Sequence, residues 1–456
     1  MQRFGRSLGG WGMSSDWPIV SIGEIASATA VGPFGSRMKA DLYVPSGVRV
    51  IRGNNLSGGR EPEGNYVHVS EKTADSLASC CLKPGDLVFP HRGNIGEVGI
   101  TPNDGLRYML STSLMKLSPD RKKAEPLYLM YFFKSAIGRS ALLMNASQVG
   151  TPGIATPLKS LRGIRLPLPP LSVQRDVADT LSKLDDRITL LRETNATLEA
   201  IAQAVFKSWF VDFDSVRAKM EGRAPEGMEE ATAALFPDGF EESELGLVPR
   251  GWPVMPIGDA VEATGGATPD TKNSAYWEPG VHCWTTPKDL SGIAAPVLLC
   301  TERKLSDQGL AKIGSGLLPV GTLLLSSRAP IGYLALAQVP VAINQGYIAM
   351  PPGGLLPPLY LLFWCRQNME HINGRANGST FMEISKKAFR PIATLVPPSG
   401  VIQAFVSVAD SLFERLVKNE GQAQTLSALR DTLLPRLISG QLRLPDGEHQ
   451  IEDHGP

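Results

Sequence analysis

The sequence of 456 residues is poor in cysteine and has no long apolar run. Its five cysteines form no C-x-x-C pair, which argues against a zinc site and against a disulfide framework. No stretch reaches the roughly 18 consecutive apolar residues of a membrane-spanning helix, and the N-terminal segment lacks the apolar core of a signal peptide. We therefore expect a cytoplasmic protein of about three domains without a metal site.

Signatures of catalysis are absent as well. The sequence has no GxxxxGK[ST] phosphate loop, no GxGxxG turn, no HExxH pair and no NPP-aromatic tetrapeptide of amino-methyltransferases. One loose pattern, Asp270 with Glu302 and Lys304, has the spacing of a metal-dependent nuclease, but the corresponding segment of the first half has no acid. We expect no catalytic residue and no cofactor bound by this chain, and keep an autonomous nuclease as a third alternative.

The formal net charge of zero conceals a segregation of charge along the chain. Lysine and arginine outnumber aspartate and glutamate by 20 to 12 in residues 1–165 and by 12 to 9 in residues 246–398. The balance reverses to 8 against 16 in residues 166–245 and to 5 against 8 in residues 399–456. A basic domain can neutralise phosphates, whereas acidic helical segments suit protein partners better. The alternative is solvated charge that is unevenly distributed without a partner.

The longest periodic segment runs from Val173 to Phe210 and contains neither Gly nor Pro. Alternating steps of four and three residues from Val177 to Trp209 meet apolar side chains at nine of ten positions, which is a heptad stripe. At about 1.5 Å per residue this helix is roughly 57 Å long, so one small domain cannot bury its stripe. The helix therefore needs a partner helix.

A second segment with the same rhythm follows 228 residues later, within residues 401–438, and identities such as Leu184/Leu412 recur at that offset. Trp17-Pro18 also recurs as Trp252-Pro253. The chain therefore reads as a tandem duplication of an α/β (α+β) domain followed by a long helix. The positions expected to pair the helices are Leu181, Leu184, Ile188, Leu191, Leu198, Leu412, Leu416, Leu426 and Leu433.

These patterns divide the chain into seven segments. They are an N-terminal extension (1–16), a first globular domain (17–170), a long helix (171–213), a linker (214–250), a second globular domain (251–398), a second long helix (399–440) and a tail (441–456). A Pro-Pro corner precedes each helix, and Gly440 is a suitable C-cap for the second.

Three phrases carry a resemblance to a known family. The segments Phe206–Asp214, Ser243–Gly246 and Leu433–Gly440 resemble the specificity subunit of Type I restriction-modification systems. The turn Gly32–Ser36 is similar to the start of a target recognition domain in that family, and the resemblance covers roughly residues 17–445. It implies a non-catalytic protein that reads DNA.

The resemblance also implies an architecture and partners. Two target recognition domains would each read half of a split, asymmetric duplex sequence, and the two helices would form an antiparallel coiled coil. Two methyltransferase subunits are expected to dock on the helices, and restriction subunits join them in some systems. S-adenosylmethionine and ATP with Mg²⁺ are expected on those partners. The alternative is a structural adaptor whose basic domains bind RNA or other anions.

Basic and amide side chains in loops are the candidate DNA contacts, because Lys and Arg neutralise phosphates, Arg pairs with guanine and Asn or Gln pairs with adenine. The candidates are Lys39, Asn54, Asn55, Arg92, Lys159 and Arg162 in the first half and Lys272, Lys288, Arg328, Asn344, Gln345, Lys387 and Arg390 in the second. A structural role is the alternative: Arg92 and Arg328 would anchor Ile-Gly turns. The pairs that would flank the helix corners are Lys159/Lys387 and Arg162/Arg390.

Two polar residues interrupt the heptad stripes. Asn195 occupies the position of Ala423 in the second helix, and Asn419 occupies that of Leu191 in the first. Polar residues in such a stripe lower stability but can fix register and orientation. The alternative is that they face solvent or a partner protein.

Overall fold

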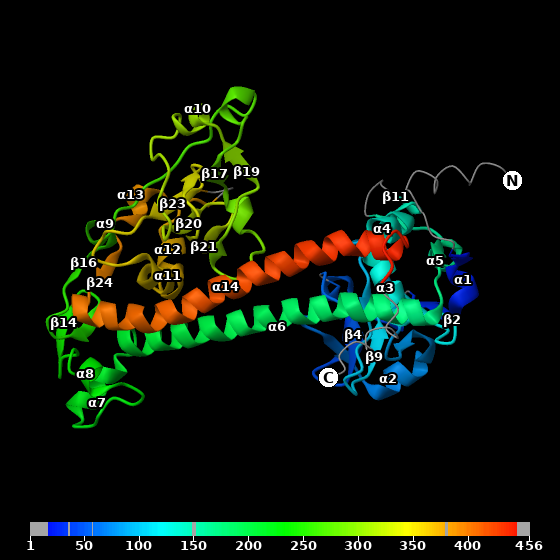
Figure 1. Ribbon diagram of the computed structural model, residues 1–456. Coiled ribbons are helices and arrows are strands. Elements are labelled where there is room, and N and C mark those ends of the chain that lie inside the picture. The colour runs from blue at the N-terminus through cyan, green and yellow to red at the C-terminus, as the bar shows by residue number, and fades with distance from the viewer. Residues whose placement is uncertain (1–16, 35–36, 57, 148–151, 379–381, 445–456) are drawn as a thin grey trace, which may run out of the picture. The chain divides into compact units, whose positions relative to one another are not determined.

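The computed structural model describes residues 17–34, 37–56, 58–147, 152–378 and 382–444 (Figure 1). The chain divides into two compact units, unit 1 (Met1–Ile188 with Thr425–Pro456) and unit 2 (Thr189–Gln424). Helices α6 (Leu171–Phe210) and α14 (Ser399–Ile438) each contribute a section to both units. The expected pair of globular domains with two long helices is confirmed. The expected extension 1–16 and tail residues 445–456 lie outside the described residues.

Unit 1 contains two main sheets with strand orders β2-β10-β7-β8 and β3-β5-β4-β9-β6. The strands are β1 (Ile19–Ser21), β2 (Ala26–Val31), β3 (Tyr43–Val44), β4 (Val48–Ile51), β5 (Val67–Val69), β6 (Cys81–Leu82), β7 (Leu87–Pro90), β8 (Gly99–Ile100), β9 (Tyr108–Leu110), β10 (Leu114–Pro119), β11 (Ala146–Ser147), β12 (Gly153–Ile154) and β13 (Arg165–Pro167). The α-helices are α1 (Ile22–Ile25), α2 (Glu71–Ser76), α3 (Pro126–Lys134), α4 (Ala136–Leu143) and α5 (Pro157–Gly163).

Unit 2 repeats this plan with sheets β18-β21-β20-β23 and β19-β17-β22. The strands are β14 (Phe240–Ser243), β15 (Gly246–Pro249), β16 (Val254–Pro256), β17 (His282–Thr285), β18 (Val297–Leu298), β19 (Arg303–Leu305), β20 (Leu323–Ser327), β21 (Ile331–Ala337), β22 (Val341–Ile343), β23 (Tyr347–Met350) and β24 (Ala393–Leu395). The α-helices are α7 (Asp214–Met220), α8 (Glu230–Ala233), α9 (Ile257–Ala260), α10 (Asp307–Leu310), α11 (Pro358–Gln367), α12 (Met369–Gly374) and α13 (Lys386–Phe389).

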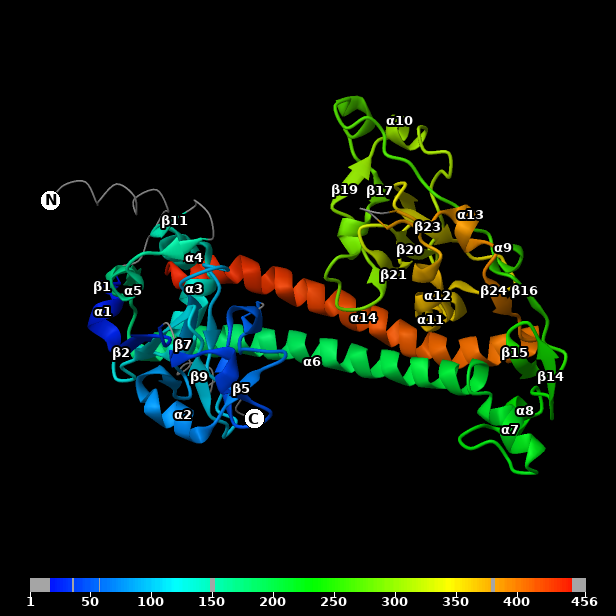
Figure 2. The same cartoon turned by 180° about the vertical axis from the view of Figure 1, so that it is seen from behind.

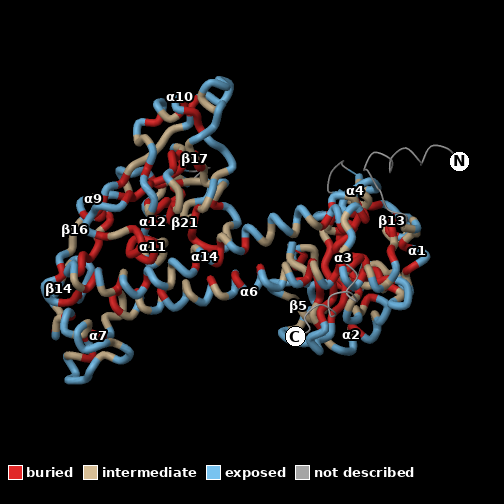
Figure 3. Tube along the Cα trace, in the orientation of Figure 1, coloured by how far each residue is buried: buried red, intermediate tan, exposed pale blue. Residues whose placement is uncertain are grey.

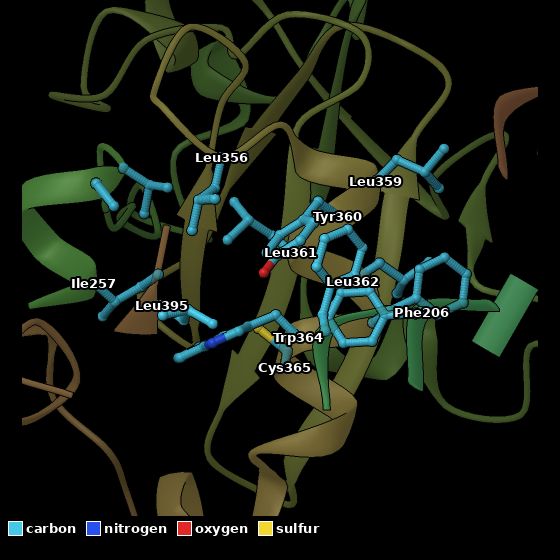
Figure 4. Close-up of a cluster of buried hydrophobic side chains, with 14 of the residues drawn as sticks. Phe206, Ile257, Leu356, Leu359, Tyr360, Leu361, Leu362, Trp364, Cys365 and Leu395 are labelled. Atoms are coloured by element: carbon cyan, nitrogen blue, oxygen red, sulfur yellow. The ribbon is translucent and has the colours of Figure 1, made fainter. Parts of the chain in front are cut away.

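One largely apolar helix lies at the centre of each unit. Helices α3 and α11 both begin with Pro at the first turn, where its missing N–H has no intrahelical partner to lose. Nearly every residue of both helices is buried, which requires cover on all sides. In unit 1, α3 shares a core with sheet residues such as Phe89 and with Leu181 of α6; α3 and strand β7 are labelled in Figure 2. In unit 2, α11 shares a core with Leu325, and Figure 4 shows Tyr360 of α11 beside Phe206 of α6.

The long helices pair antiparallel within each unit. In unit 1, Leu181 near the start of α6 shares a core with Leu437 near the end of α14. In unit 2, Phe206 near the end of α6 meets Phe405 near the start of α14, with ring centroids 5.6 Å apart. Buried and exposed residues alternate along both helices (Figure 3). Of the predicted pairing positions, Leu181, Ile188, Leu191 and Leu416 are buried, and Leu184, Leu198, Leu412, Leu426 and Leu433 are half-buried.

Both interrupting asparagines are buried inside the helix pair and bonded to each other. The Asn419 amide nitrogen donates to the Asn195 side-chain oxygen at 3.0 Å, and the Asn195 amide nitrogen donates to the Leu416 carbonyl at 3.3 Å. Their exposed fractions are 1% for Asn195 and 2% for Asn419. These residues therefore belong to the seam between the helices rather than to a surface that faces solvent.

Charged side chains fasten each globular part to the helices. In unit 1, Asp185 of α6 accepts a hydrogen bond from Tyr131 of α3 at 2.7 Å and pairs with Arg430 of α14 at 2.7 Å. In unit 2, Glu199 of α6 pairs with Arg366 of α11. Burial raises the pKa of the Tyr131 hydroxyl, and the neighbouring Asp185 carboxylate raises it further. The phenol therefore stays a donor to Asp185.

The expectation of two acidic long helices was wrong. With the helix ends defined, α6 carries 5 basic and 6 acidic residues and α14 carries 4 of each. The acidic excess lies in residues 211–245, with 3 basic against 10 acidic residues. This segment contains α7, α8 and β14, so residues 166–245 combine a nearly balanced helix with an acidic linker.

We predict that Phe206→Ala lowers the free energy of unfolding of unit 2 by about 3–5 kcal/mol, because a buried ring is replaced by a cavity. The ring centroid lies 5.0 Å from that of Tyr360 and 5.9 Å from that of Phe363. Denaturant unfolding of the full chain measures the effect. Leu190→Ala, at a position of α6 that is 51% exposed, is the control and should change the free energy by at most about 0.5 kcal/mol. Equal losses in the two variants would contradict the assignment of Phe206 to the core.

Candidate nucleic-acid interface

Five loops of unit 1 meet at one end of its strands, and we call them loop edge 1. They comprise residues 32–34, 52–54, 91–93, 111–113 and 152–156. Backbone hydrogen bonds join them: Gly32 N–H donates to Leu114, Ser111 to Ile51, His91 to Ser113 and Ile154 to His91, over 2.8–2.9 Å. The loops therefore form one connected surface although they lie far apart in the sequence.

Unit 2 contains the same arrangement, loop edge 2, comprising residues 264–268, 285–288, 327–328, 344–346 and 383–387. The bond from Ser111 to Ile51 recurs as Asn344 to Thr285 at 3.1 Å. The bond from His91 to Ser113 recurs as Ser327 to Gly346 at 2.8 Å, and the bond from Ile154 to His91 recurs as Ile384 to Ser327 at 3.0 Å. Loop edges 1 and 2 are thus equivalent products of the duplication.

Glycine is required at one equivalent position of each loop edge. A Cβ atom on Gly32 would lie 1.8 Å from the Ser111 carbonyl oxygen, and one on Gly266 would lie 1.8 Å from the Ile343 carbonyl oxygen. Both distances are far below van der Waals contact, so any side chain would push the loops apart. Gly32, which opens the family-like turn in the sequence, and its equivalent Gly266 therefore serve close backbone approach.

Several predicted contact residues lie on the loop edges with accessible side chains. Loop edge 1 presents Asn54 and Arg92, and Lys159 follows it at the exposed surface of α5. Loop edge 2 presents Lys288, which pairs with Glu302 at 2.8 Å, Arg328, which lies 3.7 Å from Glu383, and Gln345, which accepts a hydrogen bond from Thr268 at 2.7 Å. Lys387 is exposed on α13 at the same edge.

Other predicted contact residues are committed to the fold. The Asn55 side chain is 1% exposed, donates to the carbonyls of Glu63 and Asn65, and accepts from the Arg52 N–H. The Asn344 side-chain oxygen accepts the Gly346 N–H at 2.9 Å and so shapes its own turn. These amides maintain loop geometry, a role that a single sequence does not distinguish from base contact.

Arg162 and Arg390 lie at equivalent positions against α1 and α9. Arg162 donates to the Thr29 hydroxyl at 2.8 Å, and Arg390 donates to the Ala263 carbonyl at 2.9 Å. A Cβ atom on Gly258 would lie 2.6 Å from the Arg390 Cβ. Both arginines thus brace the corner before the long helix. Lys39 and Lys272 are exposed in loops outside the two loop edges as defined.

The prediction omitted three side chains of the loop edges. Lys386 is exposed beside Lys387, but its counterpart in the first half is Leu158, so no repeated basic residue marks this position in the sequence. Arg52 is half-buried, and its Nη2 donates to the Asn65 carbonyl at 3.2 Å. Phe34 is 61% exposed, which is unusual for a large apolar side chain, and it replaces Thr268 of the second half. Only the turn context of Phe34 was visible in the sequence.

A buried histidine supports loop edge 1. One ring nitrogen of His91, Nε2, lies 3.2 Å from the Thr112 carbonyl oxygen, to which the neutral Nε2–H tautomer donates. Burial lowers the pKa of His91, and the positive charge of Arg92 lowers it further. The folded protein therefore favours the neutral ring.

The nuclease pattern is not assembled into a metal site. Asp270 accepts the Lys272 N–H at 2.9 Å, while Glu302 pairs with Lys288. Among the described residues, no group of three or more His, Cys, Asp or Glu side chains is arranged to hold a metal ion.

Comparison with known proteins decides the family. The model of the Type I restriction modification DNA specificity domain matches residues 14–200 and 249–422. The chain belongs to this family. It is 26% identical over 475 residues to the HindI specificity subunit of Haemophilus influenzae, covering 94% of this chain and all of that protein. It is 34% identical over 172 residues to the MjaIX specificity subunit of Methanocaldococcus jannaschii, covering 37% of this chain and 39% of that protein.

A solved structure shares the fold of this specificity-domain protein. The S subunit of a Type I restriction-modification system from M. genitalium superimposes with a TM-score of 0.56 and 15% identity, covering 95% of this chain and 97% of that one. The predicted fold class, a tandem α/β duplication with paired long helices, is thereby confirmed. Neither long helix, nor any other described helix, has a stretch long and apolar enough to cross a membrane.

We predict that acid destabilises unit 1 through His91. Because burial lowers the folded-state pKa of this group, the unfolded state binds its proton first as the pH falls below about 6.5. The stabilisation is therefore present above that pH and is lost as pH falls through the lowered pKa. The thermal midpoint of unit 1 should fall less between pH 7.5 and pH 5 in His91→Gln than in the wild type. A fall in His91→Gln as large as that in the wild type would contradict this role.

Proposed function

We propose that this chain is the DNA specificity subunit of a Type I restriction-modification complex, with each loop edge reading one half of a bipartite, asymmetric duplex target. The observation that carries the proposal is the recurrence of the loop edges: their backbone bonds are equivalent, while their side chains differ. Phe34, Asn54 and His91 in the first correspond to Thr268, Lys288 and Ser327 in the second. Two equal scaffolds with different side chains suit two different half-sites.

The partners follow from the same proposal. The chain works with methyltransferase subunits, two of them on equivalent surfaces that the internal repeat provides, and with restriction subunits where the system cleaves DNA. S-adenosylmethionine and ATP with Mg²⁺ are bound by those subunits, and the complex acts in the cytoplasm. Basic side chains such as Arg92 and Lys387 supply the phosphate contacts that bring the loop edges to DNA.

Domain exchange tests the proposal. Residues 17–170 are replaced by the corresponding domain of a specificity subunit with another target, the chimera is produced with its methyltransferase subunits, and methylated sites are mapped. One half of the methylated sequence should change and the other should not. Exchange of residues 251–398 is the reciprocal control and should change only the other half. An unchanged methylation pattern in both chimeras would overturn the proposal, as would metal-dependent DNA cleavage by the isolated chain.

We predict that Arg92→Ala weakens binding of the complex to its target by about 5–100-fold, because the variant loses an exposed guanidinium on loop edge 1. If Arg92 contacts a base, the loss comes with relaxed sequence preference at one position; if it contacts a phosphate, the loss is uniform and the salt dependence becomes shallower. Lys122→Ala removes an exposed positive charge on the turn before α3 and is the control. Equal binding by both variants and the wild type would refute the contact.

A further inference from the structure

The Asn195–Asn419 contact has an apolar neighbour one helical turn away. Four residues back along α6 from Asn195 is Leu191, and four residues forward along α14 from Asn419 is Ala423. Because the helices are antiparallel, the two steps lead in the same direction, and Leu191 lies opposite Ala423. Both are buried, with exposed fractions of 3% and 2%.

The internal duplication exchanges these two contacts. At the repeat offset of 228 residues, Asn195 corresponds to Ala423 and Leu191 corresponds to Asn419. The two-fold relation between the helices therefore maps the hydrogen-bonded pair Asn195–Asn419 onto the apolar pair Leu191–Ala423. Of these two equivalent contacts between α6 and α14, one is thus polar and the other is apolar.

This asymmetry distinguishes the helices from one another. If α6 paired in the same register with α6 of a second copy, each Asn195 would face Leu191 of the other copy. If α14 paired with α14, each Asn419 would face Ala423. Either arrangement loses the side-chain hydrogen bond between the two asparagines and sets each buried amide against an apolar side chain, which is unfavourable. Pairing of α6 with α14 is the arrangement that brings the two amides together.

We propose that Asn195 and Asn419 form a pairing code, which directs α6 to α14 and away from self-pairing with a second copy of this chain. The asparagines are not needed to fill space, because the equivalent contact is filled by Leu191 and Ala423. The hydrogen bond between the two asparagines instead forms only when α6 pairs with α14, and it therefore favours that pairing. Pairing within one chain keeps its two different globular domains on the same helix pair. Self-pairing would instead join the equivalent helices of two copies of the chain.

Two variants of the full chain test the code at nearly constant composition. Leu191→Asn with Asn419→Leu moves one asparagine between the helices, so that α6 pairing with α6 satisfies its amides and α14 pairing with α14 is apolar. Asn195→Leu, Asn419→Ala, Leu191→Asn and Ala423→Asn together move the intact pair to the two-fold-related contact, which keeps the α6–α14 match.

The readout is association between two differently tagged copies produced in the same cells, with the mass of the purified species measured by light scattering. The first variant should co-purify its second copy at least about tenfold more than the wild type, as a species of two chains. The four-substitution variant should match the wild type, as should a control with Glu193→Ala and Gln422→Ala at exposed positions of the same turns.

Two outcomes would overturn the proposal. One is a first variant that remains a single chain with wild-type thermal stability, because mismatched amides would then carry no penalty. The other is a four-substitution variant that dimerises or fails to fold, because position rather than matching would then decide. If the first variant is insoluble, the four-substitution variant alone still tests the proposal.

Discussion

The burial of two apolar helix stripes is the constraint on which the rest of this protein depends. Each 40-residue helix is far too long for a small domain to cover, so α6 and α14 cover each other. Most residues of the central helices α3 and α11 are buried, so these helices also need cover. A sheet covers one side of each, and the long helices cover another. The helix pair is therefore part of the core of both units, and Phe206 and Leu181 belong to globular cores as much as to the seam.

The loop edges show how one backbone can hold two sets of side chains. Backbone N–H and carbonyl groups in the buried roots of loops require partners, and the same bonds meet that requirement in both units. Gly32 and Gly266 are fixed by close contact with a carbonyl oxygen. The outer residues of the loops carry no such constraint, so Phe34 of loop edge 1 occupies the position equivalent to Thr268 of loop edge 2. Divergence at the tips over a common root lets recognition change without cost to the fold.

The elements that could be predicted from the sequence are those with a local cause. The long helices follow from heptad periodicity, the duplication from a constant offset, and the end of α14 from Gly440, whose φ of +73° suits glycine. Strands of two or three residues, such as β8 and β12, have no periodicity to detect. The role of Asn55 depends on Glu63 and Asn65, which come near only in the folded loop. Candidate DNA contacts were thus located by loop, but bonded and accessible side chains could not be separated.

The acidic excess of the middle of the chain lies in the linker rather than in the long helix. The acidic total of residues 166–245 pointed to an acidic helix, yet the helix itself is nearly balanced and the acidic excess follows it in α7, α8 and β14. Like charges in this linker add to one negative field, although Asp212, Glu221 and Asp238 each pair with a basic side chain. Along the helices, by contrast, positive and negative side chains nearly offset one another. The negative field and the apolar stripes consequently belong to different segments of the chain.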